Sequence, residues 1–277
     1  MTVDRDPGYP TLVEGFGYAP CAPALWRADA GGGLESRDLS LRSASNDTLD
    51  AKHIRAGGHV RELDDLIAPN APFAFLFVLG GVVDLREEGH APVELKAFSA
   101  ATRYGAGAPV HWRLSNDAEV FLMVAHRAAA SRLGVASDTA CSWTISHDTA
   151  DAYRLGEGPR RFFKYRDLGV AGATARRIHI HVVAATGSVA GGTGWHSHTM
   201  GQIFFVLSGW ADLAVDRRPW VRMGPCDAMC LSAGMTHDVP GFSDDYRVLE
   251  MCVPADYTTT DAPAPGGLDA VQKLGLD

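Results

Sequence analysis

Short apolar runs separated by turn residues recur along most of the chain, and this pattern predicts β-strands. The clearest runs are RIHIHVVAAT (177–186), IFFVLSGWADLAVD (203–216), CDAMCLSA (226–233) and YRVLEMCV (246–253). They are rich in Phe, Val and Leu, and Gly, Asp or Asn interrupts them at intervals of about ten residues. A helical pattern is found in HRAAASRLG (126–134) and, more weakly, in DTADAYRLG (148–156). The pattern therefore predicts an all-β protein with a short, partly helical segment in its middle.

The chain also repeats itself. The segment 75–85 (FLFVLGGVVDL) matches 203–213 (IFFVLSGWADL), and 115–124 (SNDAEVFLMV) matches 243–252 (SDDYRVLEMC), both at an offset of 128 residues. Two separate segments that share one offset indicate a duplicated domain.

We predict an N-terminal copy over residues 1–126, a connector over 127–158 and a C-terminal copy over 159–277. Short strands, turn punctuation and duplication are typical of sandwiches and barrels. The pattern alone leaves open whether each copy is an immunoglobulin-like sandwich or a jelly roll.

Composition places the chain among ordinary globular proteins and excludes several classes of partner. The chain has 277 residues, of which 46% are hydrophobic, and a net charge of −8. This acidic balance predicts neither a nucleic-acid partner nor binding to an anionic membrane, and no apolar run is long enough to span a bilayer. The N-terminus lacks the apolar stretch of a secretory signal, and five cysteines are too few and uneven for a disulfide scaffold. We expect a cytoplasmic protein.

A set of histidines in the second copy is a candidate metal site. His196 and His198 are one residue apart, so on a strand both side chains point to the same face. Gln202 follows with the same parity, and His237 lies further along in SAGMTHDVP. Neutral imidazoles bind Fe, Mn, Ni, Cu or Zn, and Gln202 can add a neutral oxygen ligand or a hydrogen bond. By itself a His-x-His pair is a weak signal, because a histidine on an apolar strand is more often a core residue.

The segment GTGWHSHTMGQIFFVLSG (192–209) resembles the first cupin motif, Gly-x5-His-x-His-x3,4-Glu-x6-Gly. The motif positions are occupied, at or within one residue, by Gly191 or Gly192, His196, His198, Gln202 and Gly209, with glutamine in place of glutamate. The segment CDAMCLSAGMTH (226–237) resembles the second motif, Gly-x5-Pro-x-Gly-x2-His. Gly234 and His237 match, whereas Cys226 and Ser232 replace the motif's Gly and Pro.

This resemblance, with the repeat, implies a bicupin: two tandem jelly-roll barrels. It implies one divalent transition metal per chain in the C-terminal barrel, bound by His196, His198 and His237, with Gln202 at the position of the family's glutamate ligand. Iron is favoured, with Mn, Ni, Cu or Zn as alternatives. Neutral ligand sets are typical of cupin dioxygenases that act on enols, diketones or hydroxy-aromatics, and glutamine at this position also occurs in cupins that isomerise or open sugar-like rings.

The first copy lacks these ligands. At the offset of 128, His196, His198 and Gln202 correspond to Ala68, Asn70 and Ala74, and His237 corresponds to Pro109 or, with a slip of one residue, to Val110. We therefore expect the N-terminal barrel to be degenerate and to cover one face of the other barrel, as a subunit does in a symmetric dimer. An alternative is a metal-free ligand pocket around His111 and Trp112.

Alternation along the strands of the second copy predicts an apolar substrate pocket. Its candidate residues are Phe204, Val206, Met229 and Met251. These residues favour an aromatic or aliphatic carbonyl substrate, although filling of the barrel core explains them equally well. Tyr246, Glu250 and Asp238 could act as an acid or a base, but the sequence assigns no role to any of them.

The function that the sequence favours is a non-haem metal-dependent dioxygenase of a small chelating organic substrate. Two alternatives remain: a metal-dependent isomerase or lyase of a carbonyl or sugar-like substrate, and a non-enzymatic small-molecule-binding cupin. A homodimer is one possible assembly.

Overall fold

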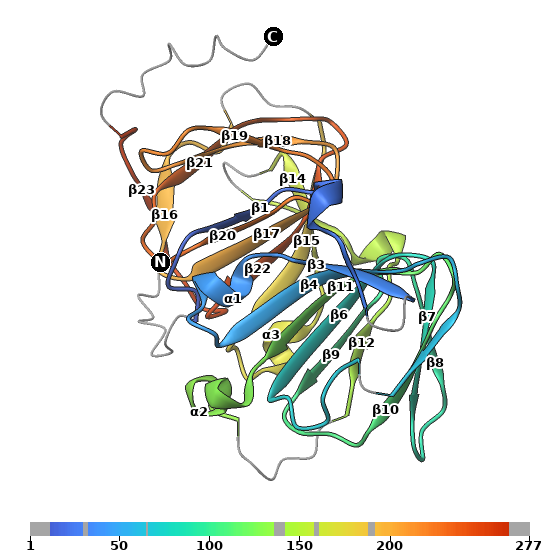
Figure 1. The fold of residues 1–277 in the computed structure, drawn as a ribbon. Coiled ribbons are helices and arrows are strands. Elements are labelled where there is room, and N and C mark those ends of the chain that lie inside the picture. The colour runs from blue at the N-terminus through green and yellow to red at the C-terminus, as the bar shows by residue number, and fades with distance from the viewer. Residues whose placement is uncertain are drawn as a thin grey trace.

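The computed structural model describes residues 12–29, 33–64, 66–135, 142–157, 161–187 and 192–265. These residues form mainly antiparallel strands with a few short helices (Figure 1), so the predicted all-β class is confirmed. No helix in these ranges has both the length and the apolar character needed to cross a membrane.

The two halves of the chain contain similar series of elements. In the first half these are β1 (Gly17–Ala19), the 3₁₀ helix η1 (Pro23–Leu25), β2 (Arg27–Ala28), β3 (Leu34–Asp38), α1 (Leu41–Ala44), β4 (Leu49–Ala56), β5 (Arg61–Leu63), β6 (Phe73–Gly80), β7 (Val82–Glu87), β8 (Val93–Lys96), β9 (Ala100–Tyr104), β10 (Val110–Leu114) and β11 (Glu119–Ala125). The middle contains η2 (Arg127–Ala129), α2 (Ala130–Leu133), β12 (Thr144–Ser146), η3 (Ala150–Ala152) and β13 (Arg154–Leu155). In the second half they are β14 (Phe163–Asp167), α3 (Val170–Ala173), β15 (His179–Ala185), β16 (His196–His198), β17 (Gly201–Ser208), β18 (Ala211–Val215), β19 (Val221–Met223), β20 (Ala228–Leu231), β21 (His237–Phe242), β22 (Arg247–Val253) and β23 (Thr259–Asp261).

Each half is a barrel made of a large and a small sheet. In the first half, a seven-stranded sheet (β12-β9-β6-β11-β4-β3-β2) faces a four-stranded sheet (β5-β10-β7-β8). In the second half, the corresponding sheets are β1-β20-β17-β22-β15-β14-β13 and β19-β18-β21-β16-β23. Figure 1 shows the two large sheets next to each other, with the small sheets on the outside.

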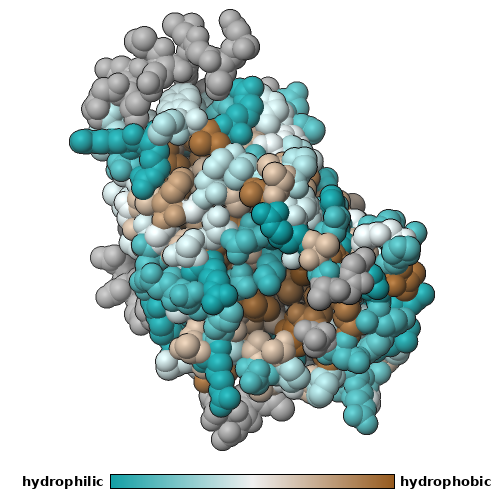
Figure 2. All heavy atoms as spheres, viewed as in Figure 1, coloured by the Kyte–Doolittle hydropathy of each residue, from teal (hydrophilic) through white to brown (hydrophobic). Residues whose placement is uncertain are grey.

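Both faces of the large sheets are buried, which explains the continuous apolar runs. On β17, Phe204 and Val206 lie in the core of the second barrel, whereas Ile203 and Phe205 lie in a core that also contains Phe121 from the first half. A strand buried on both faces loses the polar alternation of a half-exposed strand. In the view of Figure 2, hydrophilic residues surround a hollowed area below the centre, where hydrophobic residues are visible.

The two halves exchange strands and hydrogen bonds in a nearly symmetric way. The strand β1 pairs with β20 of the second half, and β12 pairs with β9 of the first. The buried Arg37 donates from Nη2 to the backbone oxygen of Cys226, and the buried Arg166 donates from Nη2 to the backbone oxygen of Phe98 at 2.6 Å. The halves therefore meet as two subunits of an isologous dimer would. The division at residues 126 and 158 stays a prediction, because strands from outside each copy complete both large sheets.

The repeat extends to single glycines. Gly81 follows β6 and Gly209 follows β17, which hold the same place in the two large sheets, and both glycines have φ of +67°. A Cβ at Gly209 would lie 2.7 Å from the backbone nitrogen of Tyr246, and a Cβ at Gly81 would lie 2.7 Å from that of Ala118. Only glycine fits both the left-handed conformation and the close approach of the backbone.

Gly209→Ala is therefore expected to lower the free energy of unfolding by at least about 2 kcal/mol, because strain and steric overlap add. Gly89→Ala is the matched control: its φ is +80°, but a Cβ there meets nothing within 4 Å. In the control, the free energy of unfolding should fall only by the cost of the left-handed conformation, about 1 kcal/mol. Urea denaturation followed by circular dichroism measures both, and equal losses would contradict the role assigned to the close approach.

Candidate metal centre

Three histidines of the second barrel face one another across two strands of its small sheet. His196 and His198 lie on β16, and His237 begins β21 directly opposite His196 in the antiparallel register. All three are buried. Before β16, Gly192 has φ of +62°, and a Cβ there would lie 2.0 Å from the backbone oxygen of Val239, so a glycine is needed where the chain enters the strand. Gly191 lies outside the described residues.

Hydrogen bonds at Nδ1 fix the orientation of the three imidazoles. The Nδ1 atom of His196 lies 2.7 Å from the backbone oxygen of Gly194, and that of His237 lies 3.1 Å from the backbone oxygen of Met235. A carbonyl only accepts, so these Nδ1 atoms carry the proton and Nε2 has the lone pair. The Nδ1 atom of His198 lies 2.8 Å from Oγ1 of Thr259 on β23. Such outer partners orient imidazoles that bind metals.

The donor set suits a transition-metal ion. Possible ligand atoms of His196, His198 and His237 all lie within 4.8 Å of one another. Their ring centroids are 4.4 to 5.2 Å apart. Three neutral nitrogen donors match the preferences of Fe, Ni, Cu and Zn. The residues present therefore fit the metal that the sequence predicts.

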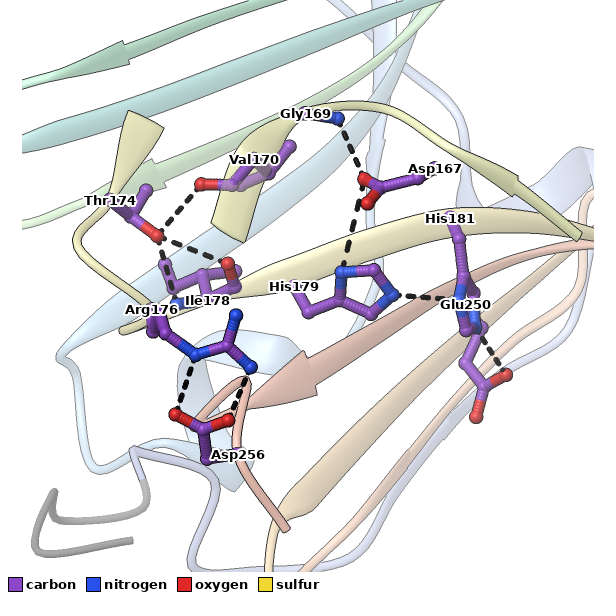
Figure 3. Close-up of polar contacts among 10 residues, drawn as sticks. All are labelled: Asp167, Gly169, Val170, Thr174, Arg176, Ile178, His179, His181, Glu250 and Asp256. Carbon is purple, nitrogen blue, oxygen red and sulfur yellow. Dashed lines mark hydrogen bonds and ion pairs between the residues drawn. The ribbon is translucent and has the colours of Figure 1, made fainter. Parts of the chain in front are cut away.

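Gln202 belongs to a row of hydrogen bonds behind the histidines. It lines a cavity that the three histidines also line, and its Nε2 donates to Oε1 of Glu250 on β22 at 2.8 Å. Nε2 of His181 lies 2.8 Å from the other oxygen of Glu250, and Nδ1 of His181 lies 2.8 Å from Nε2 of His179. Figure 3 shows His179 between Asp167 and His181, and His181 pointing at Glu250. Because the amide nitrogen of Gln202 faces Glu250, its carbonyl oxygen is directed away from that carboxylate.

Burial and hydrogen bonds determine which groups of this hydrogen-bond row are charged. Burial alone would raise the pKa of Glu250, but the hydrogen bond and charge of His181, together with His198 and Gln202, lower that pKa to about 2. Burial, aided by the charge of His181, lowers the pKa of His179 to about 4. Near neutral pH, Glu250 is thus a carboxylate and His179 a neutral imidazole.

Glu250→Gln is expected to lower the stability of the metal-free protein at pH 7 by about 1–3 kcal/mol, because a charge-assisted hydrogen bond is lost. The pKa of Glu250 is lower in the folded state than the value of about 4.3 in an unfolded chain. The stabilisation that ionised Glu250 gives the folded protein is therefore complete above about pH 4.3 and is lost as the pH falls towards 2. Urea midpoints of the two proteins should converge over this window, and a constant difference down to pH 2 would contradict the assignment.

The cavity beside the histidines has a volume of about 60 Å³ and mixed walls. Of the predicted pocket residues, Phe204 lines it, whereas Val206 and Met229 pack in the barrel core nearby. For Met251 the prediction is wrong, because its side chain lies in the core between the barrels and does not line the cavity. On β22, Glu250 and Val248 pair with Phe204 and Val206, and partners in an antiparallel register share a face. Met251 opposes Ile203 and points the other way.

The three candidate acids or bases, Glu250, Tyr246 and Asp238, differ in whether they line the cavity. Glu250 and Tyr246 line the cavity, and burial raises the pKa of Tyr246, so its hydroxyl stays protonated. Asp238 is not among the lining residues and accepts a hydrogen bond from Oγ1 of Thr193 at 3.1 Å. His179 and His181 were not among the residues predicted from the sequence, although HIH has the same spacing as the pair His196 and His198.

A second group of possible ligands lies between the barrels but suits a cation poorly. It consists of His53, Glu119 and Cys226. Nε of Arg37 donates to Nδ1 of His53 at 3.2 Å, and Nε2 of His53 lies 2.5 Å from Oε1 of Glu119. Burial lowers the pKa of His53. Both imidazole nitrogens therefore face protein groups already, and the neighbouring guanidinium repels a metal ion.

Comparison with solved structures identifies the fold. The protein Ylba from E. coli superposes with a TM-score of 0.65 at 12% identity, covering 90% of this chain and 95% of that one. Oxalate decarboxylase from Lactobacillus farciminis, in a formate complex, gives 0.57 at 12% identity over 85% of each chain. HEPD from Streptomyces albus, with 2-hydroxyethylphosphonate and Fe(II) bound, gives 0.60 at 11% identity over 87% of this chain and 76% of that one.

The chain has the cupin fold in its two-barrel, bicupin form, as its motifs and repeat predict. No protein-family model matches the sequence, and no curated protein is significantly similar to it. At these identities the likeness concerns the fold, and function has to come from the site itself.

Proposed function

We propose that the C-terminal barrel binds one divalent transition metal through His196, His198 and His237, with iron as the favoured ion. We further propose that the protein is a metal-dependent oxygenase of a small chelating substrate. The observation that supports this most directly is the hydrogen bonding of all three Nδ1 atoms, which orients the imidazoles within 4.8 Å of one another. The bound Fe(II) of HEPD is consistent with iron in this fold.

A bound iron would supply Lewis acidity and a redox couple for reaction with dioxygen. The protein's own groups would orient the substrate and control water. Gln202 would present its carbonyl oxygen to the ion or to a bound substrate, and Glu250 acts as a positioning residue because it holds the amide nitrogen. Phe204, Val248 and Phe163 form apolar walls that exclude water. The cavity of about 60 Å³ is well below the usual 300–1,000 Å³ of ligand pockets, which favours a small substrate.

The carboxylate of Glu250 also favours a second candidate, a metal-dependent isomerase or lyase. It lines the cavity as an ionised carboxylate, but a pKa of about 2 makes it a weak base. It would therefore accept a proton from a carbon acid next to a carbonyl only where a bound metal polarises that carbonyl and acidifies the proton. The formate complex of the oxalate decarboxylase is consistent with a small carboxylate as substrate. The third candidate that the sequence predicts is a small-molecule-binding protein without catalysis.

Oxygen consumption separates these functions. The protein would be loaded anaerobically with Fe(II) and mixed with a panel of enols, diketones, hydroxy-aromatics and hydroxy acids. We expect oxygen uptake to match substrate loss and to be absent in His196→Ala, while the exposed-histidine control His59→Ala retains it. Substrate loss that proceeds equally under argon would contradict an oxygenase and support the isomerase or lyase. No turnover with any metal or substrate would favour the binding protein.

A further inference from the structure

The first barrel contains a larger cavity than the proposed metal site. Its volume is about 310 Å³, at the lower end of the range for small-molecule pockets. It lies between β4, β11 and the segment 66–71. The lining residues that matter here are Asp50, Lys52, Leu122, Val124, His126 and Arg127.

This cavity occupies the place that the hydrogen-bond row has in the second barrel. Asp50 and Lys52 on β4 pair with Val124 and Leu122 on β11. In the second half, His179 and His181 on β15 pair in the same way with Cys252 and Glu250 on β22. The duplicated position thus keeps polar groups in both halves, with an acid and a lysine where the second half has two histidines.

Two buried polar atoms of residues that line this cavity have no hydrogen-bond partner within the described part of the chain. Asp50 is only 8% exposed, and its Oδ1 has no hydrogen-bond partner among the residues that the structure describes. The same holds for the buried Nε2 of His126. Native structures rarely leave buried polar atoms unsatisfied, so each such atom requires an explanation. Asp50 forms part of the cavity wall, so a ligand with a hydrogen-bond donor can bind to its carboxylate.

The other lining residues indicate which further groups a ligand would carry. Lys52, whose Nζ lies 4.0 Å from Oδ2 of Asp50, and the exposed Arg127 provide two cations, which attract a carboxylate. Leu122 and Val124, together with Leu66, provide apolar surface for an aliphatic chain. We propose that this cavity binds a small aliphatic carboxylate that also carries an ammonium or hydroxyl donor.

The site differs from the pocket around His111 and Trp112 that the sequence suggested as an alternative. The imidazole of His111 pairs with Glu62 and Asp64 on the outside of the small sheet. Trp112 is fully buried in the core of the first barrel. Neither residue lines the cavity of about 310 Å³. The inference is independent of the function proposed for the second barrel.

Calorimetry on the full chain with four matched probes tests the inference. Leucine and 2-hydroxy-4-methylpentanoate carry both a carboxylate and a donor. In contrast, 4-methylpentanoate lacks the donor and 3-methylbutylamine lacks the carboxylate. At least one of the first two is expected to bind, and each truncated probe should bind at least about ten-fold more weakly, because one charge-assisted contact is lost. Preference for leucine or for the hydroxy acid distinguishes the two kinds of donor.

Substitutions of lining residues test whether the probes bind in this cavity. Lys52→Met, which changes a half-exposed side chain, and Asp50→Asn, which preserves shape, should each weaken binding at least about ten-fold. Lys96→Met, at an exposed lysine of the small sheet, and the pair His196→Ala/His198→Ala should leave binding unchanged. Absence of binding by all probes would overturn the inference. It would equally be overturned if binding survived Lys52→Met but disappeared in the histidine variant.

Discussion

Replacing His196 and His198 together by alanine is expected to reduce the metal content of the purified protein from about one ion per chain to less than about a tenth of that, since a single imidazole cannot hold the ion. The two side chains supply two of the three nitrogen donors that lie within 4.8 Å of one another. Elemental analysis measures the content on protein purified without chelators and without a histidine tag. The metal found also bears on mechanism, because iron supports oxygen chemistry and zinc supports the isomerase or lyase.

The control for this experiment is His59→Ala. His59 is an exposed histidine of the first half, so its loss should leave metal content unchanged. Unchanged metal in the double variant would place the ion elsewhere and would contradict the assignment to these histidines. If neither protein held metal after reconstitution with Fe, Mn, Ni, Cu and Zn in turn, a metalloenzyme would be contradicted.

The sequence contained the main features of the fold because they depend on local pattern. Apolar runs and turn residues located the strands, and the offset of 128 residues paired β6 with β17 and β11 with β22. The spacing of His196, His198 and His237 within two motifs was sufficient to bring these residues together as a candidate site. Such features need only the strand period and the turn chemistry.

Features that depend on pairing across the chain could not be predicted in this way. Nothing local in 17–19 indicates that β1 joins β20 of the other half. Met251 was placed in the pocket because a strand buried on both faces shows no polar alternation from which to read its direction. The role of Glu250 requires the register that sets it against His181 and Gln202, and the cavity at Asp50 requires the position of the segment 66–71.

Phe205→Ala is expected to cause the largest loss of stability, about 3–5 kcal/mol, because it removes a buried aromatic ring and leaves a cavity. Phe205 is fully buried on β17, and it packs against the first half of the chain. Its ring centroid lies 5.2 Å from that of Phe121 and 5.4 Å from that of His53. Leu155→Ala is the control, since that side chain is 63% exposed and should cost less than about 0.5 kcal/mol.

This loss tests whether the two barrels stabilise each other as subunits of a dimer do. Phe205 faces the shared core, whereas its neighbours Phe204 and Gln202 face the proposed metal site. In urea, tryptophan fluorescence and far-ultraviolet circular dichroism should therefore shift together to a lower midpoint. Under conditions where the variant is folded, its metal content should equal that of the unmodified protein. A loss of less than about 1 kcal/mol would show that the core between the barrels contributes little to stability, because a well-packed phenylalanine cannot be removed at so small a cost.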